Sequence, residues 1–150
     1  MGLLLERRFV PARNAAAEGP KLLGKALDVP GANWEAHPLS TVLYMSTRCR
    51  FCLQSMPYYR KLATAKDSTG AHVPLAIISM DPQGDIEALL SAEHIKADGI
   101  YRLPKSDPKL RVTPMLLIAD SKGIVRRAYV GELGPVQEAE FLGILRSGSL

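Results

Sequence analysis

Cys49 and Cys52 are the only cysteines of the chain, and they closely follow the apolar run of residues 41–45. Residues three apart share one face of a helix, so these thiols are spaced to close a disulfide within one turn. A thiol in the first turn lies at the positive end of the helix dipole, which favours the reactive thiolate. Beside a βαβ pattern this spacing predicts redox chemistry, with Cys49 as the nucleophile.

Other interpretations of the cysteine pair are also open. The two residues could form a static disulfide, supply half of a metal site, or be packed as small hydrophobic side chains. The surrounding elements and the remaining polar residues must decide between these interpretations and the redox one.

Composition restricts the class of protein in which this chemistry could occur. The chain has 150 residues, of which 47% are hydrophobic, so it is expected to fold as one domain with an adequate core. The net charge of +4 arises from dispersed charges of both signs, and only 6% of residues are aromatic, which argues against a nucleic-acid surface. No apolar stretch reaches the ~20 residues of a membrane span, and the apolar part of residues 1–8 is too short for a signal peptide.

The chain divides into two parts by pattern. Residues 1–23 are expected to be a linker or the trimmed stub of a membrane anchor, because residues 11–20 are small or polar with no sustained apolar period. Residues 24–150 are expected to form the folded domain, because strand-like and helix-like patterns alternate through them.

The first half of the domain predicts strands at residues 25–29 and 41–45. A helix is expected over residues 50–66, with an apolar stripe at helical period that is interrupted by Pro57. The proline ring removes a backbone hydrogen bond and should bend this helix.

The second half begins with a buried strand at 75–80 and a turn at 81–84 that leads into a helix bearing Ile86. Residues 114–119 and 124–130 then predict an antiparallel hairpin around the turn at 120–123. A closing helix should start at Pro135, which suits a first turn. The order predicts a mixed sheet with helices on both faces.

Several motifs now agree in order and spacing: Cys49-x-x-Cys52, Met56-Pro57 after it, Val112-Thr113-Pro114 opening a strand, and the hairpin turn at 120–123. Together they resemble the thioredoxin-fold proteins of the TlpA/ResA-like (redoxin) branch, over residues 24–145. The resemblance implies a thioredoxin-like α/β fold: a mixed central sheet, helices on both faces and a central αβ insertion.

The resemblance also implies an activity, thiol-disulfide exchange on protein substrates without a cofactor or metal. Cys49 would attack and Cys52 would resolve the mixed disulfide. Pro114 would be a cis-proline facing the pair, and the backbone of Thr113 would bind an extended substrate segment. Only about one X-Pro bond in twenty is cis, so the cis expectation comes from the resemblance alone.

The implied partners are protein thiols and disulfides, with an upstream redox partner and no nucleic acid. The implied location is the bacterial periplasm or another extracytoplasmic side, with an N-terminal membrane tether in the full-length protein. A cytoplasmic chain is the alternative.

The chain departs from the family near the cysteines. Arg50-Phe51 lacks the proline common between them, Ser55 stands where many members carry a glutamate, and Leu43 stands where thioredoxin has a buried aspartate. No local carboxylate is therefore available for proton transfer. Asp81 and Glu87 are candidate substitutes, although such positions are more often turn or solvated helix residues.

Arg48 and Arg50 flank the nucleophile. A cation within ~4–6 Å favours a thiolate, so these two residues are candidates for lowering the pKa of Cys49. Surface arginines that point to solvent are the equally weighted alternative.

Three other functions compete with exchange. A peroxiredoxin-like peroxidase would need a proline where Val42 stands, four residues before Ser46. A copper-site or metal-site assembly protein would use the thiols with His37, His72 or His94, although the copper-assembly family spaces its cysteines by three residues. The third is a non-catalytic interaction module with a static disulfide.

Overall fold

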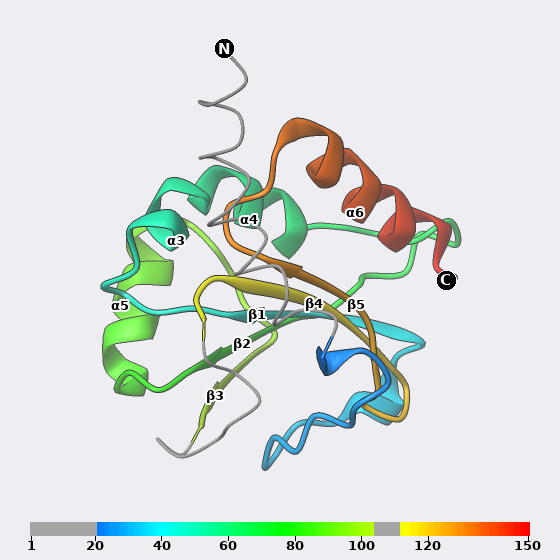
Figure 1. The fold of residues 1–150 in the computed structure, drawn as a ribbon, viewed down its shortest axis with the longest axis horizontal. Helices are drawn as coiled ribbons and strands as arrows, with labels where there is room; N and C mark the ends of the chain where they lie inside the picture. Colours follow the sequence, from blue (N-terminus) through cyan, green and yellow to red (C-terminus); the bar gives the residue numbers. More distant parts are fainter. Residues whose placement is uncertain (1–20, 104–111) are drawn as a thin grey trace.

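The computed structural model describes residues 21–103 and 112–150. Its centre is a five-stranded sheet in the order β3-β2-β1-β4-β5 (Figure 1). The strands are β1 (Leu39–Tyr44), β2 (Leu75–Ser79), β3 (Gly99–Arg102), β4 (Met115–Asp120) and β5 (Val125–Val130). The helices are η1 (Trp34–Ala36), α3 (Arg50–Gln54), α4 (Met56–Ala63), α5 (Gln83–Ala92) and α6 (Pro135–Ser147).

The central strand β1 runs parallel to β2 and antiparallel to β4, which confirms the mixed sheet. All six residues of β1 are buried because the sheet is covered on both faces. Successive side chains point to opposite faces, so Leu43 lies in the core beneath the helices, whereas Val42 and Tyr44 lie in a second core on the other face.

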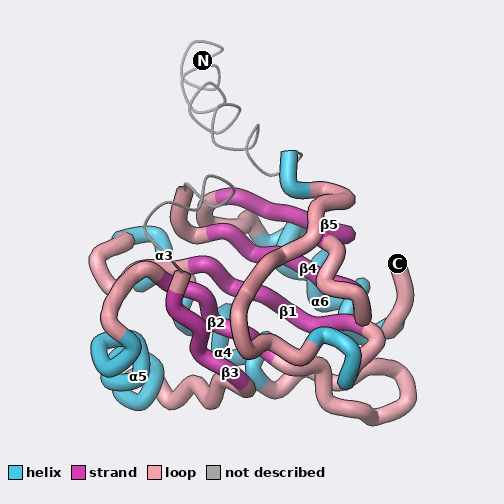
Figure 2. The backbone as a smooth tube through the Cα atoms, turned by 90° about the horizontal axis from the view of Figure 1, so that it is seen from below, coloured by secondary structure: helices cyan, strands magenta, loops and turns pink. Residues whose placement is uncertain are grey.

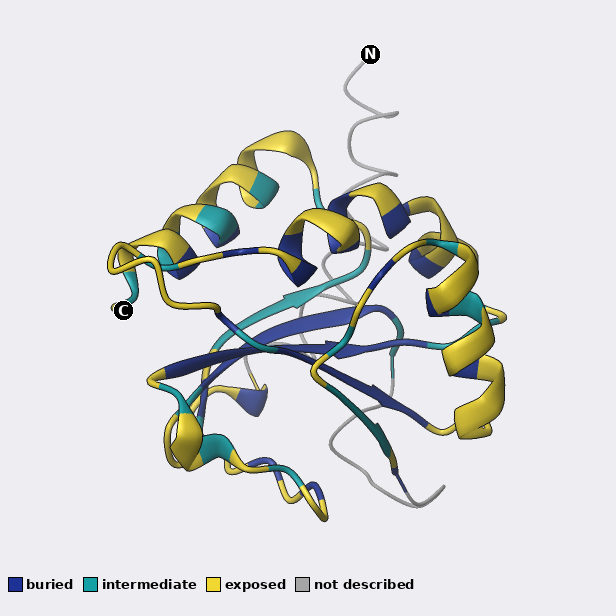
Figure 3. Ribbon diagram, turned by 180° about the vertical axis from the view of Figure 1, so that it is seen from behind, coloured by how far each residue is buried: buried dark blue, intermediate teal, exposed yellow. Residues whose placement is uncertain are grey.

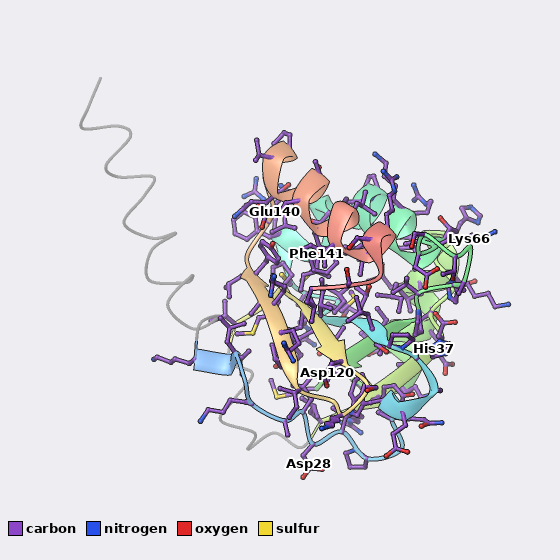
Figure 4. All side chains as sticks on the ribbon, turned by 90° about the vertical axis from the view of Figure 1, so that its right-hand side faces the viewer. Asp28, His37, Lys66, Asp120, Glu140 and Phe141 are labelled. Carbon is purple, nitrogen blue, oxygen red and sulfur yellow. The ribbon has the colours of Figure 1, made fainter. Side chains whose placement is uncertain are left out.

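Three long helices cover one face of the sheet. The crossovers from β1 to β2 and from β2 to β3 run in the same direction across the sheet, and parallel crossovers are right-handed as a rule, which puts α4 and α5 on the same side. Leu62 of α4, Ile86 of α5 and Phe141 of α6 belong to one buried cluster. Figure 3 shows that the buried parts of the helices face the sheet, whereas their outer sides are exposed. Figure 4 shows Phe141 beside Glu140 on α6.

The opposite face is covered by the segment from Lys21 to η1, which crosses the sheet in Figure 2. Leu22, Leu27, Val29 and Trp34 of this segment pack on the second core. The fold class is confirmed, with long helices on one face and only a short helical turn among the elements of the other.

The predicted helix at 50–66 is two helices. The prediction of one continuous helix was wrong, whereas the predicted change of direction near Pro57 is confirmed. Helix α3 ends at Gln54 with Ser55 as its C-cap, and α4 begins at Met56 with Pro57 in its first turn. Proline fits there because the first-turn N–H groups have no partner within the helix. Helix α4 ends at Ala63, three residues before the expected end.

The predicted strand at 25–29 was also wrong. Only Ala26 forms a bridge, with Ile124, before the chain turns across the sheet to bury Leu27 and Val29. Leu22, within the expected linker, is 2% exposed, so packing begins before residue 24. Residues 1–20 of that segment lie outside the described residues.

Strand β3 was not assigned from the residues. It pairs in parallel with β2, and together α5 and β3 supply the αβ insertion that the resemblance implied. Within the described ranges, no helix is both long and apolar enough to cross a bilayer.

The predicted hairpin between β4 and β5 is confirmed. The Asp120 carboxylate, labelled in Figure 4, accepts the N–H groups of Lys122 (2.9 Å) and Ile124 (3.1 Å). Gly123 has a φ of 76°, and a Cβ at this position would lie 2.5 Å from Cδ1 of Trp34. Position 123 therefore requires glycine for two reasons, its backbone conformation and the close approach of Trp34.

We expect Gly123→Ala to lower the free energy of unfolding by about 2–4 kcal/mol, because it adds a steric clash to the cost of positive φ. Gly70→Ala is the matched control, since Gly70 has a φ of 83° with no atom within 4 Å of the added Cβ. Its expected cost is about 1 kcal/mol. Urea unfolding measures both, and equal losses would contradict the close approach of Trp34.

Candidate active site

The two cysteines lie just past the end of β1, where the chain turns into α3. Cys49 is the N-cap of this helix, and its Sγ accepts the backbone N–H of Cys52 at 3.2 Å. Its carbonyl accepts the N–H of Leu53 at 3.1 Å, which starts the helix. The first-turn N–H groups of a helix have no partner within it, so the sulfur of Cys49 satisfies one of them.

The two thiols differ in exposure. Both are free, with Cys49 half-buried and Cys52 0% exposed. Burial, followed by the hydrogen bond with Cys49, raises the pKa of Cys52 to about 12, against weaker lowering by the Ser46 backbone and the Thr113 side chain. Cys52 is therefore protonated at neutral pH, and Cys49 is the sulfur that a partner can reach.

The Thr113-Pro114 bond is cis, as the resemblance implied. The Thr113 side chain lies close enough to Cys52 to act on its pKa, which places this residue beside the cysteine pair. Within the described residues the Thr113 backbone makes no hydrogen bond to other backbone groups. The neighbouring Pro114 carbonyl, by contrast, accepts the N–H of Gly131 at 2.8 Å.

Asp81 holds the loop that leads into Cys49. It follows β2, whose end lies beside that of β1 because the two strands are parallel. Its Oδ2 accepts hydrogen bonds from Thr47 N–H (2.7 Å), Thr47 Oγ1 (2.9 Å) and Ser46 Oγ (3.2 Å). Burial works to raise the pKa of Asp81, but these hydrogen bonds and the charge of Arg48 outweigh it and lower the pKa.

Arg48 and Arg50 are both exposed, and both lie near groups other than the Cys49 sulfur. The charge of Arg48 acts on Asp81. With its amide turned to satisfy its hydrogen bonds, Gln54 accepts from Nε of Arg50 (3.3 Å) and donates to Glu132 (3.2 Å). Neither arginine donates a hydrogen bond to Cys49 in the described part of the chain.

The structure adds two residues to the site that the sequence did not point to. Tyr59 was recognised only as part of an apolar stripe, yet it is close enough to both cysteines for their charges to act on its pKa. That pKa is raised, chiefly by burial, so Tyr59 remains neutral. Glu132 comes from the loop before α6, and no local pattern links it to residues 49–59.

The other candidate residues are directed elsewhere. Glu87 is exposed on α5 and accepts a hydrogen bond from Gln83 at 2.9 Å, as a solvated helix residue does. His72 contacts Asp98 at 2.9 Å, and His94 follows α5. Across residues 21–103 and 112–150, no three His, Cys, Asp or Glu side chains converge as a metal site.

We expect iodoacetamide to modify Cys49 at pH 8 at least about a hundredfold faster than Cys52. A pKa raised from 9.0 to about 12 leaves Cys52 with roughly a thousandfold less thiolate than an ordinary thiol. Mass spectrometry of partly modified, reduced protein measures the ratio, with urea-unfolded protein as the control in which the rates converge. Preferential labelling of Cys52 in folded protein would contradict this assignment.

The sequence matches no protein-family model and no curated protein. Solved structures do resemble it. A thiol-disulfide isomerase from Corynebacterium glutamicum has a TM-score of 0.62 at 19% identity, covering 85% of this chain and 98% of its own. A thioredoxin-related protein from Neisseria meningitidis serogroup B has a TM-score of 0.58 at 19% identity, covering 82% and 96%.

A third similar structure is the exposed lipoprotein thioredoxin of Streptococcus pneumoniae, with a TM-score of 0.50 at 14% identity, covering 75% of this chain and 87% of its own. At these identities the likeness concerns the fold. The shared fold agrees with the mixed five-stranded sheet and its helices. The chain is a thioredoxin-fold protein.

Proposed function

We propose that this protein catalyses thiol-disulfide exchange on protein substrates through Cys49 and Cys52. The observation that carries the proposal is the contrast between the two thiols beside a cis-proline: a reachable N-cap sulfur and a fully buried partner three residues later. Similar solved structures include a thiol-disulfide isomerase, which supports the same chemistry.

In the first step the Cys49 thiolate attacks one sulfur of a substrate disulfide. The substrate S–S bond breaks, its other sulfur leaves as a thiolate, and a mixed disulfide forms at Cys49. Cys52 then loses its proton to the departing thiolate or to water and attacks Cys49 Sγ. The substrate leaves with two thiols, and the protein pair holds the disulfide. The reverse sequence oxidises a substrate dithiol.

The high pKa of Cys52 suits this order of events. Its hydrogen bond with Cys49 and the charge of Cys49 both contribute to that raised pKa. Once Cys49 is in a mixed disulfide it carries no charge, so part of the cause is removed at the moment when Cys52 must ionise. Cys52 is thereby kept unreactive until a substrate is attached.

The substrate segment would lie in extended form against Thr113, whose backbone has no backbone partner among the described residues. Backbone pairing of this kind gives affinity with little sequence preference, which suits varied protein substrates. We place the protein on the extracytoplasmic side, tethered by its N-terminus and served by an upstream redox partner. The exposed lipoprotein among the similar structures supports that location.

The direct test is insulin reduction driven by dithiothreitol. Cys49→Ala should reduce the catalysed rate at least about a hundredfold, whereas Cys52→Ala should accumulate a mixed disulfide that is visible on a non-reducing gel. A Cys49→Ala protein that still formed adducts as fast as wild type, with an inert Cys52→Ala protein, would reverse the roles. Wild-type protein without exchange activity and with a potential below about −300 mV would instead indicate a static disulfide.

We further expect the pair to be more oxidising than thioredoxin, whose potential lies near about −270 mV. Arg48 and Arg50 stabilise a thiolate but not a neutral disulfide, and each pKa unit is worth about 1.4 kcal/mol, or roughly 30 mV. Both side chains are exposed, so solvent screening limits the effect to a fraction of that. Glutathione-buffer titration of wild type beside Arg50→Ala measures it, and equal potentials would reject a role for Arg50.

A further inference from the structure

One carboxylate oxygen of Asp81, next to the active site, accepts three hydrogen bonds. The donors are the backbone and hydroxyl of Thr47 and the hydroxyl of Ser46, which lie 34 and 35 residues away in sequence. The shortest of them, from Thr47 N–H, is 2.7 Å. Hydrogen bonds to a charged acceptor are about twice as strong as neutral ones, so the carboxylate ties this loop firmly to the end of β2.

Ser46 links the loop that Asp81 holds to both cysteines. Its carbonyl accepts the N–H of Cys49 at 3.2 Å, and its hydroxyl accepts the N–H of Arg48 at 3.2 Å. Its backbone also acts on Cys52, whose pKa it works to lower. The loop of residues 46–48 thus sets the position of Cys49, the N-cap of α3, and with it the 3.2 Å contact from Cys52 N–H to Cys49 Sγ.

We propose that Asp81 is a positioning residue for the exchange reaction, which holds the 46–48 loop so that the first turn of α3 stabilises the Cys49 thiolate. The proposal rests on the proposed function only for the biological use of that thiolate. The carboxylate does not need to reach either sulfur to act in this way, because it acts through Ser46 and Thr47.

The charge of Asp81 and the loop geometry that it maintains should have opposite effects on the pKa of the Cys49 thiol. The direction of the pKa change therefore tests the proposal. A carboxylate near Cys49 disfavours a second negative charge, so removal of the charge alone would lower the pKa of the Cys49 thiol. Loss of the loop geometry would instead weaken the N–H contact to the thiolate and raise that pKa. Asparagine retains an acceptor oxygen without the charge, whereas alanine removes both.

The experiment compares wild type, Asp81→Ala and Asp81→Asn by the pH dependence of Cys49 alkylation and by redox titration in glutathione buffers. At pH values below the pKa of Cys49, Asp81→Ala should reduce the Cys49 thiolate fraction about tenfold, which corresponds to about one pKa unit. In titrations run well above the pKa of Cys49, where the reduced form carries the thiolate, the disulfide potential should become more reducing by roughly 30 mV. Asp81→Asn should restore the thiolate fraction to within about threefold of wild type.

Asp85→Ala is the matched control, because Asp85 is an exposed carboxylate in the first turn of the adjoining α5 and should leave both readouts unchanged. If Asp81→Ala does not fold, Thr47→Val removes one of the donors while keeping the backbone bond. It should lower the thiolate fraction about threefold and shift the potential in the same direction as expected for Asp81→Ala. Equal shifts of Asp81→Ala and Asp81→Asn toward more thiolate, or an unchanged Asp81→Ala protein, would overturn the proposal.

These readouts need no protein substrate. A wild-type protein without exchange activity would therefore refute the proposed function while the three proteins still compare the effect of Asp81 on the thiol. An active wild type with an unaffected Asp81→Ala variant would refute the positioning role alone.

Discussion

The contact from Cys52 N–H to Cys49 Sγ is the interaction around which this structure is organised. It makes a cysteine the N-cap of α3, a place where helices need an acceptor and where a side chain remains reachable from solvent. The same contact turns the second cysteine inward, where it is 0% exposed. One helix start thus produces two thiols with different accessibility and different ionisation.

That helix start depends on the sheet beneath it. The parallel strands β1 and β2 end at the same edge, so the loop after β1 meets Asp81 after β2. The antiparallel neighbour β4 begins at that edge too, and it brings the cis Thr113-Pro114 pair against Cys52. The site is built from three segments that are distant in sequence and adjacent only because of the strand order.

The electrostatics of the site follow from burial and from shared hydrogen bonds more than from the flanking arginines. Cys52 is kept protonated chiefly by desolvation, and Asp81 is kept ionised by the loop that it holds. Arg48 and Arg50 are exposed, with Asp81 and Gln54 as neighbours, so solvent weakens their effect on the thiol. The buried groups therefore have the larger influence on when each sulfur ionises.

Local pattern was sufficient for the elements whose signals are local. The buried strands β1, β2 and β4, the hairpin at Asp120 and the bend at Pro57 each follow from residue type and spacing, because strand burial, turn chemistry and the missing proline N–H act over a few residues. The cysteine spacing likewise pointed to the site. The cis state of Pro114 was available only through the resemblance to a family, since the bond by itself favours trans.

Tertiary structure decided what depends on contact between distant segments. Strand β3 has four residues with a weak pattern, and it is a strand because β2 offers it backbone partners. The residue pattern of 25–29 predicts a strand, but this segment crosses the sheet instead, because Leu27 and Val29 are buried in the second core. The sequence alone left Asp81 as a turn residue among other candidates. Its role as the holder of the 46–48 loop exists only because two parallel strands end side by side, and no spacing along the chain encodes that proximity.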